Sequence, residues 1–424
     1  MNRFRYVVCA GLLLCAVLSQ NAVAQSDKAK KIDDFVTPFA KSSQFSGVVL
    51  AAQDGKIIYE KAFGLANADF KIPNQLNTRI GIASITKFMT SVILSRMVES
   101  NKIALADKLN KYLPDFPNGD KITIEMLARH RSGIPHRVMP SEAESVAYTS
   151  AEFIEKVKLA KLAFEPGTGR LYSSAGYAVL ARVLEIVSGK PYSQLLQEYV
   201  FTPAGMTDSV DFEGEAVMER RAQDYYLSPN GLVNVPLKNY SFLVGAGSVY
   251  GTARDVYRFG EAVLDAKYGE GVKTNLLGET TLSGSGSTNG HRSYFEIERN
   301  RKYGFVILSN SAGVFDLISR GVLEILQGKE ATVKSFTIPQ IIPNPNKNLA
   351  EFLGRYKRDD GTEGEVVLRN GFLYSGDIKL YPTKTDCFFE YRFFGDVCFN
   401  RDQSAKIKDI KWKGYNFDFT WVRQ

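Results

Sequence analysis

The sequence is poor in the side chains that bind metal ions and cofactors. Its 424 residues include only three histidines and four cysteines. No His-Glu-x-x-His pattern occurs, and Cys9 and Cys15 lie in an N-terminal segment that we expect to be removed. The two remaining cysteines cannot complete the four-ligand shell of a structural zinc ion. We therefore expect no metal site and no cofactor.

Long apolar runs are also missing. Residues 6–18 form an apolar stretch that is shorter than the roughly 20 residues needed to span a membrane. Arg3 and Arg5 precede this stretch, and Ala22-Val23-Ala24 follows it. A basic region, an apolar region and a small-residue cleavage site in this order are typical of a secretory signal peptide. We expect cleavage of residues 1–24 and a periplasmic or secreted mature chain without a stable membrane span.

The chain has no strong excess of charge of either sign. Its 53 basic and 46 acidic residues give a formal net charge of +7. Loss of Arg3 and Arg5 with the signal peptide leaves 51 basic residues and a mature charge of +5. The remaining excess is dispersed, with no dense Lys/Arg cluster and no nucleic-acid motif. We therefore expect no nucleic-acid partner.

Two cysteines, Cys387 and Cys398, remain in the expected mature chain. They lie 11 residues apart in a region rich in strand-forming residues. An exported protein reaches an oxidising compartment, where such a pair more often forms a local disulfide than a metal site. We expect a disulfide between them, with two unpaired core cysteines as the alternative.

The hydrophobic pattern changes along the chain from strand to helix and back to strand. Residues 46–66 contain two short apolar runs around Asp54-Gly55, a strong turn signal, and predict a β-hairpin. Apolar residues then recur at helical spacing over residues 84–99 and 175–188. Residues 303–309 predict a buried strand, and residues 315–327 a closing helix. This order predicts an α+β domain over residues 25–337, whose sheet pairs its N-terminal and C-terminal strands.

A proline-rich segment separates this domain from a second one. Residues 338–347 contain Pro339, Pro343 and Pro345, which exclude both a helix and a central strand. Beyond them, Asn370-Gly371 is a hairpin turn signal, and an aromatic residue stands at every second position in Tyr415, Phe417, Phe419 and Trp421. We expect residues 348–424 to form a small antiparallel β domain, as a curled sheet or a barrel.

Ser84-Ile85-Thr86-Lys87 is the most promising catalytic pattern. At the start of a helix, side chains three positions apart project from one face, so the Lys87 amine can reach the Ser84 hydroxyl and take its proton. The partial positive charge of a helix N-terminus also favours the alkoxide and a developing oxyanion. About two Ser-x-x-Lys patterns are expected by chance in such a chain, so the surroundings have to support this one.

Tyr172 is the candidate partner of this pair. It lies in the segment Tyr172-Ser173-Ser174, directly before the predicted helix over residues 175–188. Beside Lys87 it could act as a phenolate base if the charge of the lysine lowers the pKa of the tyrosine. The alternative role of a single tyrosine at this place is packing against that helix.

Five segments together resemble the serine β-lactamase-related hydrolases, which include class C β-lactamases, DD-carboxypeptidases and β-lactamase-fold esterases. In chain order they are Ser84-Ile85-Thr86-Lys87, Leu127-Ala128-Arg129-His130-Arg131-Ser132-Gly133-Ile134-Pro135, Pro166-Gly167-Thr168, Tyr172-Ser173-Ser174 and Gly251-Thr252-Ala253-Arg254-Asp255. The resemblance implies a β-lactamase/transpeptidase-like domain with an antiparallel sheet and helices. It also implies that Ser84 attacks a carbonyl, that Lys87 and Tyr172 handle the protons, and that water releases the acyl group. The C-terminal domain resembles the lipocalin-like barrel of some family members.

Two motifs depart from the family pattern. The second motif is usually Tyr-x-Asn, whereas Ser174 stands at its third position here. For the third motif, usually Lys-Thr-Gly or His-x-Gly on a strand, the spacing favours Gly284-Ser285-Gly286. The small residues there would let the backbone approach the substrate closely. The amides of Ser84 and Ser287 would then form the oxyanion hole.

An alternative register places the third motif at His291-Arg292-Ser293, which keeps a histidine but loses the glycine. In the favoured register, Gly284 stands where relatives have a cation that helps to hold a substrate carboxylate. We therefore expect a substrate without a free carboxylate near the scissile bond. Arg292 or Arg254 could instead supply that charge, or either could be an ordinary surface arginine.

The remaining histidines are poor candidates for a catalytic triad, because no Gly-x-Ser-x-Gly pattern opens a helix in this chain. In relatives, the segment that corresponds to residues 127–135 braces the floor of the active site. We therefore expect His130 to have a structural role, and we assign no catalytic role to His136.

The sequence predicts an exported serine hydrolase that cleaves an ester or amide bond through a Ser84 acyl-enzyme. We expect a small-molecule or peptide substrate, with peptidoglycan fragments among the candidates. One alternative is a DD-carboxypeptidase or weak β-lactamase that acts on peptidoglycan-type substrates. The other is a binding protein that keeps the same fold and senses peptidoglycan fragments without turnover.

Overall fold

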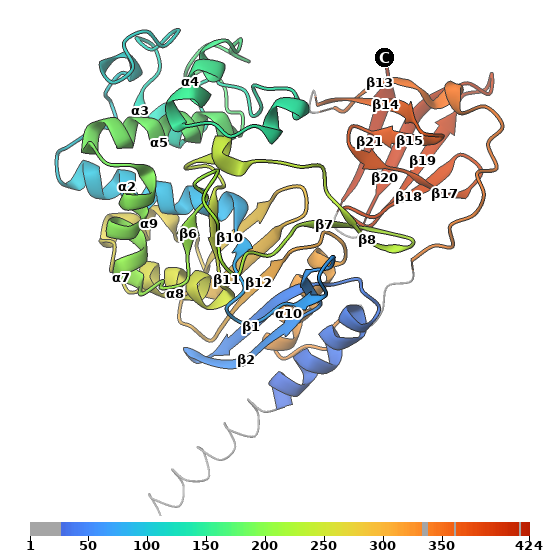
Figure 1. Cartoon of the computed structure of the whole chain (residues 1–424), viewed down its shortest axis with the longest axis horizontal. Coiled ribbons are helices and arrows are strands. Elements are labelled where there is room, and N and C mark those ends of the chain that lie inside the picture. The colour runs from blue at the N-terminus through green and yellow to red at the C-terminus, as the bar shows by residue number, and fades with distance from the viewer. Residues whose placement is uncertain (1–26, 333–337, 360–361, 415–416) are drawn as a thin grey trace, which may run out of the picture.

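A computed structural model describes residues 27–332, 338–359, 362–414 and 417–424. The predicted signal peptide, the predicted domain end at residue 337 and Tyr415 lie outside these described residues. Figure 1 shows an N-terminal domain with helices around a sheet and a β-rich C-terminal domain at its side. Within the described ranges, no helix is both long enough and apolar enough to cross a membrane.

A five-stranded antiparallel sheet forms the centre of the N-terminal domain, with the strand order β10-β11-β12-β1-β2. The predicted hairpin consists of β1, Gly47–Gln53, and β2, Lys56–Phe63, and both turn residues between them have positive φ angles. β12, Tyr303–Ser309, pairs with β1 from Gly47 opposite Ser309 to Gln53 opposite Tyr303. The sheet therefore pairs its N-terminal and C-terminal strands, as the sequence predicts.

Helices cover both faces of this sheet. Successive side chains of a strand point to opposite faces, so each strand contributes to two cores. Val48 and Leu50 of β1 share a core with α2, Thr86–Glu99, and α8, Ala253–Leu264. Val49 and Ala51 share a second core with α10, Phe315–Leu326, and with the helical residues 27–41. Burial on both faces explains why β1 and β12 are apolar along almost their whole length.

The helix predictions agree with the structure to within two residues. A 3-10 turn, Ala83–Ile85, precedes α2, and α5, Ser174–Ser188, ends at Gly189, whose φ angle of 68° suits glycine. Further helices are α3 Ile124–Ala128, α4 Ser150–Lys158, α6 Tyr192–Leu196, α7 Thr202–Ala204 and α9 Glu270–Leu276. Further strands are β3 Leu65–Asn67, β4 Ile72–Pro73, β5 Ile80–Gly81, β6 Val210–Asp211, β7 Tyr225–Ser228, β8 Gly231–Asn234, β9 Val249–Gly251, β10 Thr281–Ser287 and β11 Arg292–Glu298.

The C-terminal domain is a nearly closed antiparallel barrel with the strand order β16-β15-β14-β13-β21-β20-β19-β18-β17. The predicted Asn370-Gly371 turn joins β14, Glu363–Arg369, to β15, Phe372–Ser375. Aromatic side chains such as Phe352, Phe388 and Trp412 fill the barrel core. The remaining strands are β13 Gly354–Lys357, β16 Ile378–Lys379, β17 Tyr381–Lys384, β18 Cys387–Glu390, β19 Gly395–Arg401, β20 Ile407–Lys413 and β21 Asp418–Arg423.

A disulfide joins neighbouring barrel strands. Cys387 of β18 stands opposite Cys398 of β19, with their Cα atoms 4.1 Å apart. The predicted linker, residues 338–347, forms no helix or strand although the structure describes all of it.

Apolar contacts connect the barrel to the N-terminal domain. Phe389, Tyr391 and Phe394 of the barrel belong to the same buried cluster as α10. The β7 and β8 hairpin also reaches from the N-terminal domain toward the barrel (Figure 1). The two domains are therefore held together by packing as well as by their connecting segment.

Candidate active site

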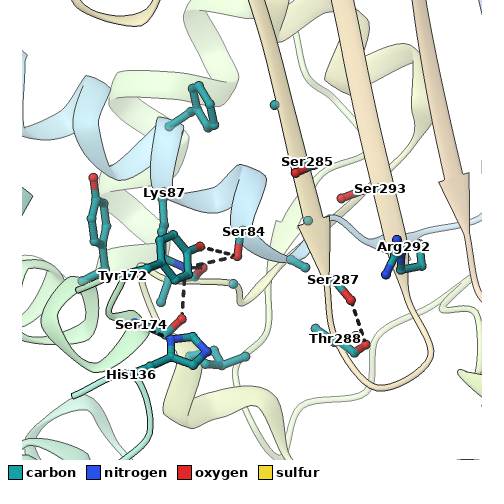
Figure 2. A pocket seen from close by; sticks show the side chains of 18 of the residues that line it. Ser84, Lys87, His136, Tyr172, Ser174, Ser285, Ser287, Thr288, Arg292 and Ser293 are labelled. Atoms are coloured by element: carbon teal, nitrogen blue, oxygen red, sulfur yellow. Dashed lines mark hydrogen bonds between the residues drawn. The ribbon is translucent and has the colours of Figure 1, made fainter. Parts of the chain in front are cut away.

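Ser84 lies in the 3-10 turn that leads into α2. Its neighbour Ala83 has a φ angle of 47°, in the left-handed region that costs a non-glycine residue about 1 kcal/mol. Lys87 follows one helical turn later, and its Nζ lies 3.2 Å from Ser84 Oγ (Figure 2). The helical spacing therefore brings the hydroxyl and the amine together, as the Ser-x-x-Lys pattern predicts.

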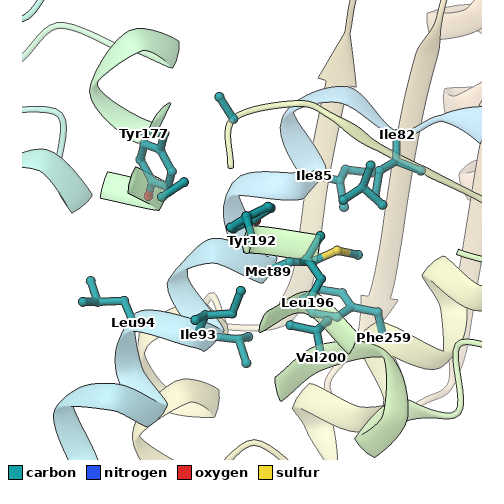
Figure 3. Close-up of a cluster of buried hydrophobic side chains, with 14 of the residues drawn as sticks. Ile82, Ile85, Met89, Ile93, Leu94, Tyr177, Tyr192, Leu196, Val200 and Phe259 are labelled. Atoms are coloured by element: carbon teal, nitrogen blue, oxygen red, sulfur yellow. The ribbon is translucent and has the colours of Figure 1, made fainter. Parts of the chain in front are cut away.

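A dense apolar core anchors the helix that carries this pair (Figure 3). The side chains of this core that are fully buried include Ile82, Ile85, Met89, Ile93, Leu196, Val200 and Phe259. Thr90 Oγ1 adds a hydrogen bond of 2.6 Å to the carbonyl oxygen of Gly245. This packing fixes α2, and with it Ser84 and Lys87, relative to the rest of the site.

Lys87 is a buried amine surrounded by neutral oxygen atoms. Only 5% of the residue is exposed, and Nζ donates to Ser84 Oγ at 3.2 Å, Ser174 Oγ at 3.2 Å and the Ala246 carbonyl at 2.6 Å. Burial lowers the pKa of Lys87 to about 7. A large fraction of the amine is therefore neutral near pH 7, and a neutral amine can accept the proton of Ser84.

Tyr172 is the second hydrogen-bond partner of the Ser84 hydroxyl and lies beside Lys87 (Figure 2). Its phenol donates to Ser84 Oγ at 2.8 Å, and Lys87 Nζ lies 4.9 Å from the centre of its ring. The condition for a Tyr172 phenolate, a pKa lowered by Lys87, is not met, because burial raises this pKa and outweighs the hydrogen bond to Ser84. Tyr172 is therefore a neutral phenol that donates a hydrogen bond to Ser84, and the Lys87 amine is the group of the two that can accept a proton near pH 7.

Two histidines brace the segment that carries Tyr172 and Ser174. His130 Nδ1 accepts from the Ser173 amide at 3.1 Å, and His136 Nδ1 accepts from the Ser174 amide at 3.2 Å. Burial, and then the charge of Lys87, lower the pKa of both imidazoles to about 4. Both rings are therefore neutral acceptors, which fits the structural role predicted for His130. The sequence reasoning missed the matching role of His136.

The backbone of β10 forms the opposite wall of the site (Figure 2). A Cβ atom added to Gly286 would lie 2.3 Å from the Ile82 carbonyl oxygen and 2.8 Å from the Ser84 nitrogen, so only glycine fits there. Ser293 Oγ also donates to the Ile82 carbonyl at 2.7 Å, which ties β11 to the same turn. The structure therefore brings the predicted motif Gly284-Ser285-Gly286 against Ser84.

The amide of Ser287 faces the cleft. Thr288, the next residue, donates its amide to the His291 carbonyl at 2.9 Å, across the β10 and β11 ladder. Because successive amides of an antiparallel strand point to opposite edges, the Ser287 amide points away from β11. This orientation suits the oxyanion role predicted for the amides of Ser84 and Ser287.

The structure places His291 in the core instead of the cleft. His291 is fully buried, with its ring 5.3 Å from that of Tyr250, and it is not among the described residues that line the cleft. The alternative third motif at residues 291–293 therefore offers no histidine to a substrate. Arg254, the other candidate cation, forms an ion pair with Glu60.

Arg292 lines the cleft, but its charge is neutralised. Its Nη2 contacts the carboxylate oxygens of Asp316 at 3.0 and 3.1 Å. Gly284 provides no cation, and a Cβ atom there would lie 2.9 Å from the ring of Phe88. The ring of Phe88 thus fills the space beside the position where the family has a lysine or a histidine.

These residues line one cleft of about 1450 Å³. Its walls include Ser84, Lys87, Tyr172, Ser174, Gly286 and Ser287. Over the described part of the chain, no three His, Cys, Asp or Glu side chains are grouped so that they could hold a metal ion. The cleft presents a hydroxyl, an amine, a phenol and two backbone amides, which are the groups that acyl transfer requires.

Several known proteins have similar sequences. Penicillin-binding protein 4* of Bacillus subtilis (strain 168) is 25% identical in a gapped alignment of 435 positions, which covers 90% of this chain and 96% of that protein. PbpX of the same strain is 30% identical over 249 residues, which are 59% of this chain and only 61% of PbpX. The D-alanyl-D-alanine-carboxypeptidase/endopeptidase AmpH of Escherichia coli (strain K12) is 28% identical in an alignment of 273 positions, which covers 62% of this chain and 69% of AmpH.

Solved structures show the same fold. A D-amino acid amidase from Ochrobactrum anthropi SV3 has a TM-score of 0.64 and 20% identity, and covers 72% of this chain and 99% of its own. SurE has a TM-score of 0.62 and 18% identity, and covers 95% of this chain and all of its own, so its likeness extends over both domains. The family model described as Beta-lactamase matches residues 32–327. The chain belongs to the Beta-lactamase family of serine hydrolases.

Proposed function

We propose that this protein is an exported serine hydrolase that cleaves an ester or amide bond through an acyl-enzyme on Ser84. The observation that carries the proposal is the hydrogen-bonded set around Ser84 Oγ, which lies 2.8 Å from the Tyr172 hydroxyl and 3.2 Å from the Lys87 amine. Burial of that amine keeps part of it neutral near pH 7 and able to take a proton.

In the proposed acylation step, neutral Lys87 accepts the proton of Ser84 while Oγ attacks the substrate carbonyl carbon. The amides of Ser84 and Ser287 stabilise the negative charge that develops on the carbonyl oxygen. The bond between the carbonyl carbon and the leaving oxygen or nitrogen then breaks. The proton held by Lys87 reaches the leaving group through the Tyr172 hydroxyl, so that Lys87 is neutral again.

In the proposed deacylation step, a water molecule attacks the ester carbonyl of the acyl-enzyme. Its proton passes to the Tyr172 and Lys87 pair, which returns a proton to Ser84 Oγ as the ester bond breaks. The free acid and the original enzyme result. The same two amides stabilise both tetrahedral intermediates, because the carbonyl oxygen occupies one place in both steps.

The proposed substrate has no free carboxylate beside the scissile bond. The strand position that carries a cation in relatives is Gly284 here, and the ring of Phe88 fills the adjoining space. Arg292 on the same wall is already paired with Asp316. A substrate carboxylate at this wall would therefore have to lose its water without gaining a free cation, which is unfavourable.

The second candidate function is a DD-carboxypeptidase or weak β-lactamase. It is favoured by the match to penicillin-binding protein 4* over 90% of this chain and by the match to AmpH. It predicts a stable penicillin adduct on Ser84. A purely binding role is less well supported, because Ser84, Lys87 and Tyr172 keep the contacts that proton transfer needs.

The test is labelling with a neutral fluorophosphonate probe combined with hydrolysis of p-nitrophenyl esters. We expect the wild type and Ser95→Ala, a matched serine variant in the same helix, to be labelled and active, and Ser84→Ala to be neither. An unlabelled wild type, or equal labelling of Ser84→Ala, would rule out the proposed enzyme. Binding of muropeptides without turnover, unchanged in Ser84→Ala, would instead support the binding role.

A further inference from the structure

A loop of the C-terminal barrel contacts the turn that follows the proposed oxyanion strand. The loop, residues 391–394, joins β18 to β19, and the turn, residues 288–291, joins β10 to β11. Arg392 Nη2 donates to Asn289 Oδ1 at 3.3 Å. Asn289 is 3% exposed and lies two positions after Ser287. A side chain of the barrel thus fixes the turn next to the Ser287 amide.

A second contact holds the other end of the same turn. The Arg292 guanidinium lies 5.5 Å from the ring of Phe393 of the barrel and 5.5 Å from the ring of Phe315 in α10. Its ion pair with Asp316 completes this arrangement. Arg292 stands directly opposite Ser287 in the β10 and β11 ladder. Contacts from the barrel therefore reach the turn after Ser287 and the first residue of β11 (Figure 2 shows Arg292 beside Ser287 and Thr288).

The barrel holds its own loop in a defined shape. Glu390 is fully buried, and its carboxylate accepts the amides of Arg392 at 2.8 Å and Phe393 at 3.0 Å. Arg392 Nη1 also donates to Asp377 at 2.9 Å, and its guanidinium lies 5.5 Å from the ring of Tyr226. These contacts hold the Arg392 side chain in one orientation independently of Asn289, so its hydrogen bond to Asn289 has a defined geometry.

We propose that Arg392 and Phe393 of the C-terminal barrel are positioning residues for the hydrolase reaction. They hold the β10 and β11 turn so that the Ser287 amide stays aimed at the position of the substrate oxyanion. The inference rests on the proposed function for the identity of the reaction. Loss of an oxyanion donor lowers kcat by roughly 100-fold to 1000-fold, and partial misplacement of such a donor by a smaller factor.

The experiment compares Arg392→Ala with Arg401→Ala in the full chain. Arg401 is a matched control, because its guanidinium pairs with Asp386 and Glu351 inside the barrel. We expect Arg392→Ala to lower kcat for a neutral p-nitrophenyl ester about tenfold, with KM changed less than about twofold. Arg401→Ala should keep kcat within about twofold, and Arg392→Lys should recover part of the loss.

A double-mutant cycle and hydrogen exchange complete the test. Because Asn289 and Arg392 act through one contact, the variant that combines Asn289→Ala and Arg392→Ala should lose little more kcat than either single variant. Backbone amides of residues 284–291 should exchange faster in Arg392→Ala and in Phe393→Ala, and at the wild-type rate in Arg401→Ala. The exchange measurement requires no activity, so it decides on the positioning role even if Ser84 proves not to be a nucleophile.

Equal kcat and equal exchange in Arg392→Ala and wild type would overturn the proposal. An equal loss in Arg401→Ala would also overturn it, because general destabilisation of the barrel would then explain both effects. Labelling of Ser84 in the wild type is scored separately, since its absence contradicts the proposed function and leaves the exchange comparison valid.

Discussion

Replacement of Lys87 by methionine should make the protein more stable while removing its activity. Burial lowers the pKa of Lys87 from 10.5 to about 7, and each pKa unit corresponds to about 1.4 kcal/mol. The unfolded chain keeps an ordinary lysine, so near pH 7 the buried lysine makes folding less favourable by about 4 kcal/mol. Methionine has a similar length and no charge, and it avoids this cost.

The Lys87→Met variant loses part of this gain in the free energy of unfolding. The Ala246 carbonyl accepts from Lys87 at 2.6 Å, and leaving such a buried acceptor without a donor costs about 1 to 3 kcal/mol. We therefore expect Lys87→Met to raise the free energy of unfolding by about 2 kcal/mol near pH 7. The wild type binds fewer protons when folded than when unfolded between the two pKa values, so its stability rises with pH. The advantage of the variant should therefore fall to zero near about pH 9 and reverse above it.

Urea unfolding followed by the helical circular dichroism signal measures this effect, because the N-terminal domain contains α2 and the other long helices whereas the barrel is built of strands. Lys102→Met, which removes an exposed lysine just after α2, is the control and should change stability by less than about 0.5 kcal/mol. A Lys87→Met variant that is less stable than the wild type near pH 7, or a difference that does not narrow as pH rises, would refute the account of the buried amine.

Further predictions concern the base, the strand and the disulfide. In the proposed mechanism the neutral amine of Lys87 is the base, so kcat/KM for a neutral ester should rise with pH to a plateau, with an apparent pKa of about 7. A flat profile would exclude Lys87 as the base. Gly286→Ala should lower kcat at least about 100-fold without unfolding the protein, because a Cβ atom would lie 2.8 Å from the Ser84 nitrogen; near-normal kcat would contradict the close approach of β10. The disulfide closes a loop between Cys387 and Cys398, 11 residues apart, and constrains the unfolded chain, so replacing both cysteines by serine should destabilise the barrel by about 3 kcal/mol. Denaturant titration followed by tryptophan fluorescence measures this loss, and an unchanged free energy of unfolding would contradict it.

Patterns in the sequence predicted the elements that are set by interactions between residues close together in the chain. The Asp54-Gly55 turn signal predicted the hairpin of β1 and β2, and apolar residues at helical spacing predicted α2 and α5. The Ser-x-x-Lys spacing predicted the contact between Ser84 and Lys87, because three positions along a helix set that distance whatever surrounds it.

The features that the sequence did not reveal depend on contacts between distant segments. The Ala246 carbonyl that holds Lys87 is 159 positions away along the chain, and no local pattern marks a carbonyl as an acceptor. The sequence left open whether the pKa of Tyr172 is lowered, and burial, which depends on the whole fold, raises it. The contact between Arg392 and Asn289 joins two domains and has no sequence signal of its own.

The most direct test of the central claim is acid quenching of the protein during turnover of an activated ester, followed by peptide mass spectrometry. The account predicts a mass increase equal to the acyl group on the peptide that contains Ser84, and no such increase in Ser84→Ala. Turnover of the ester without an adduct on Ser84 in the wild type, or an adduct on another residue that persists in Ser84→Ala, would contradict the acyl-enzyme on Ser84.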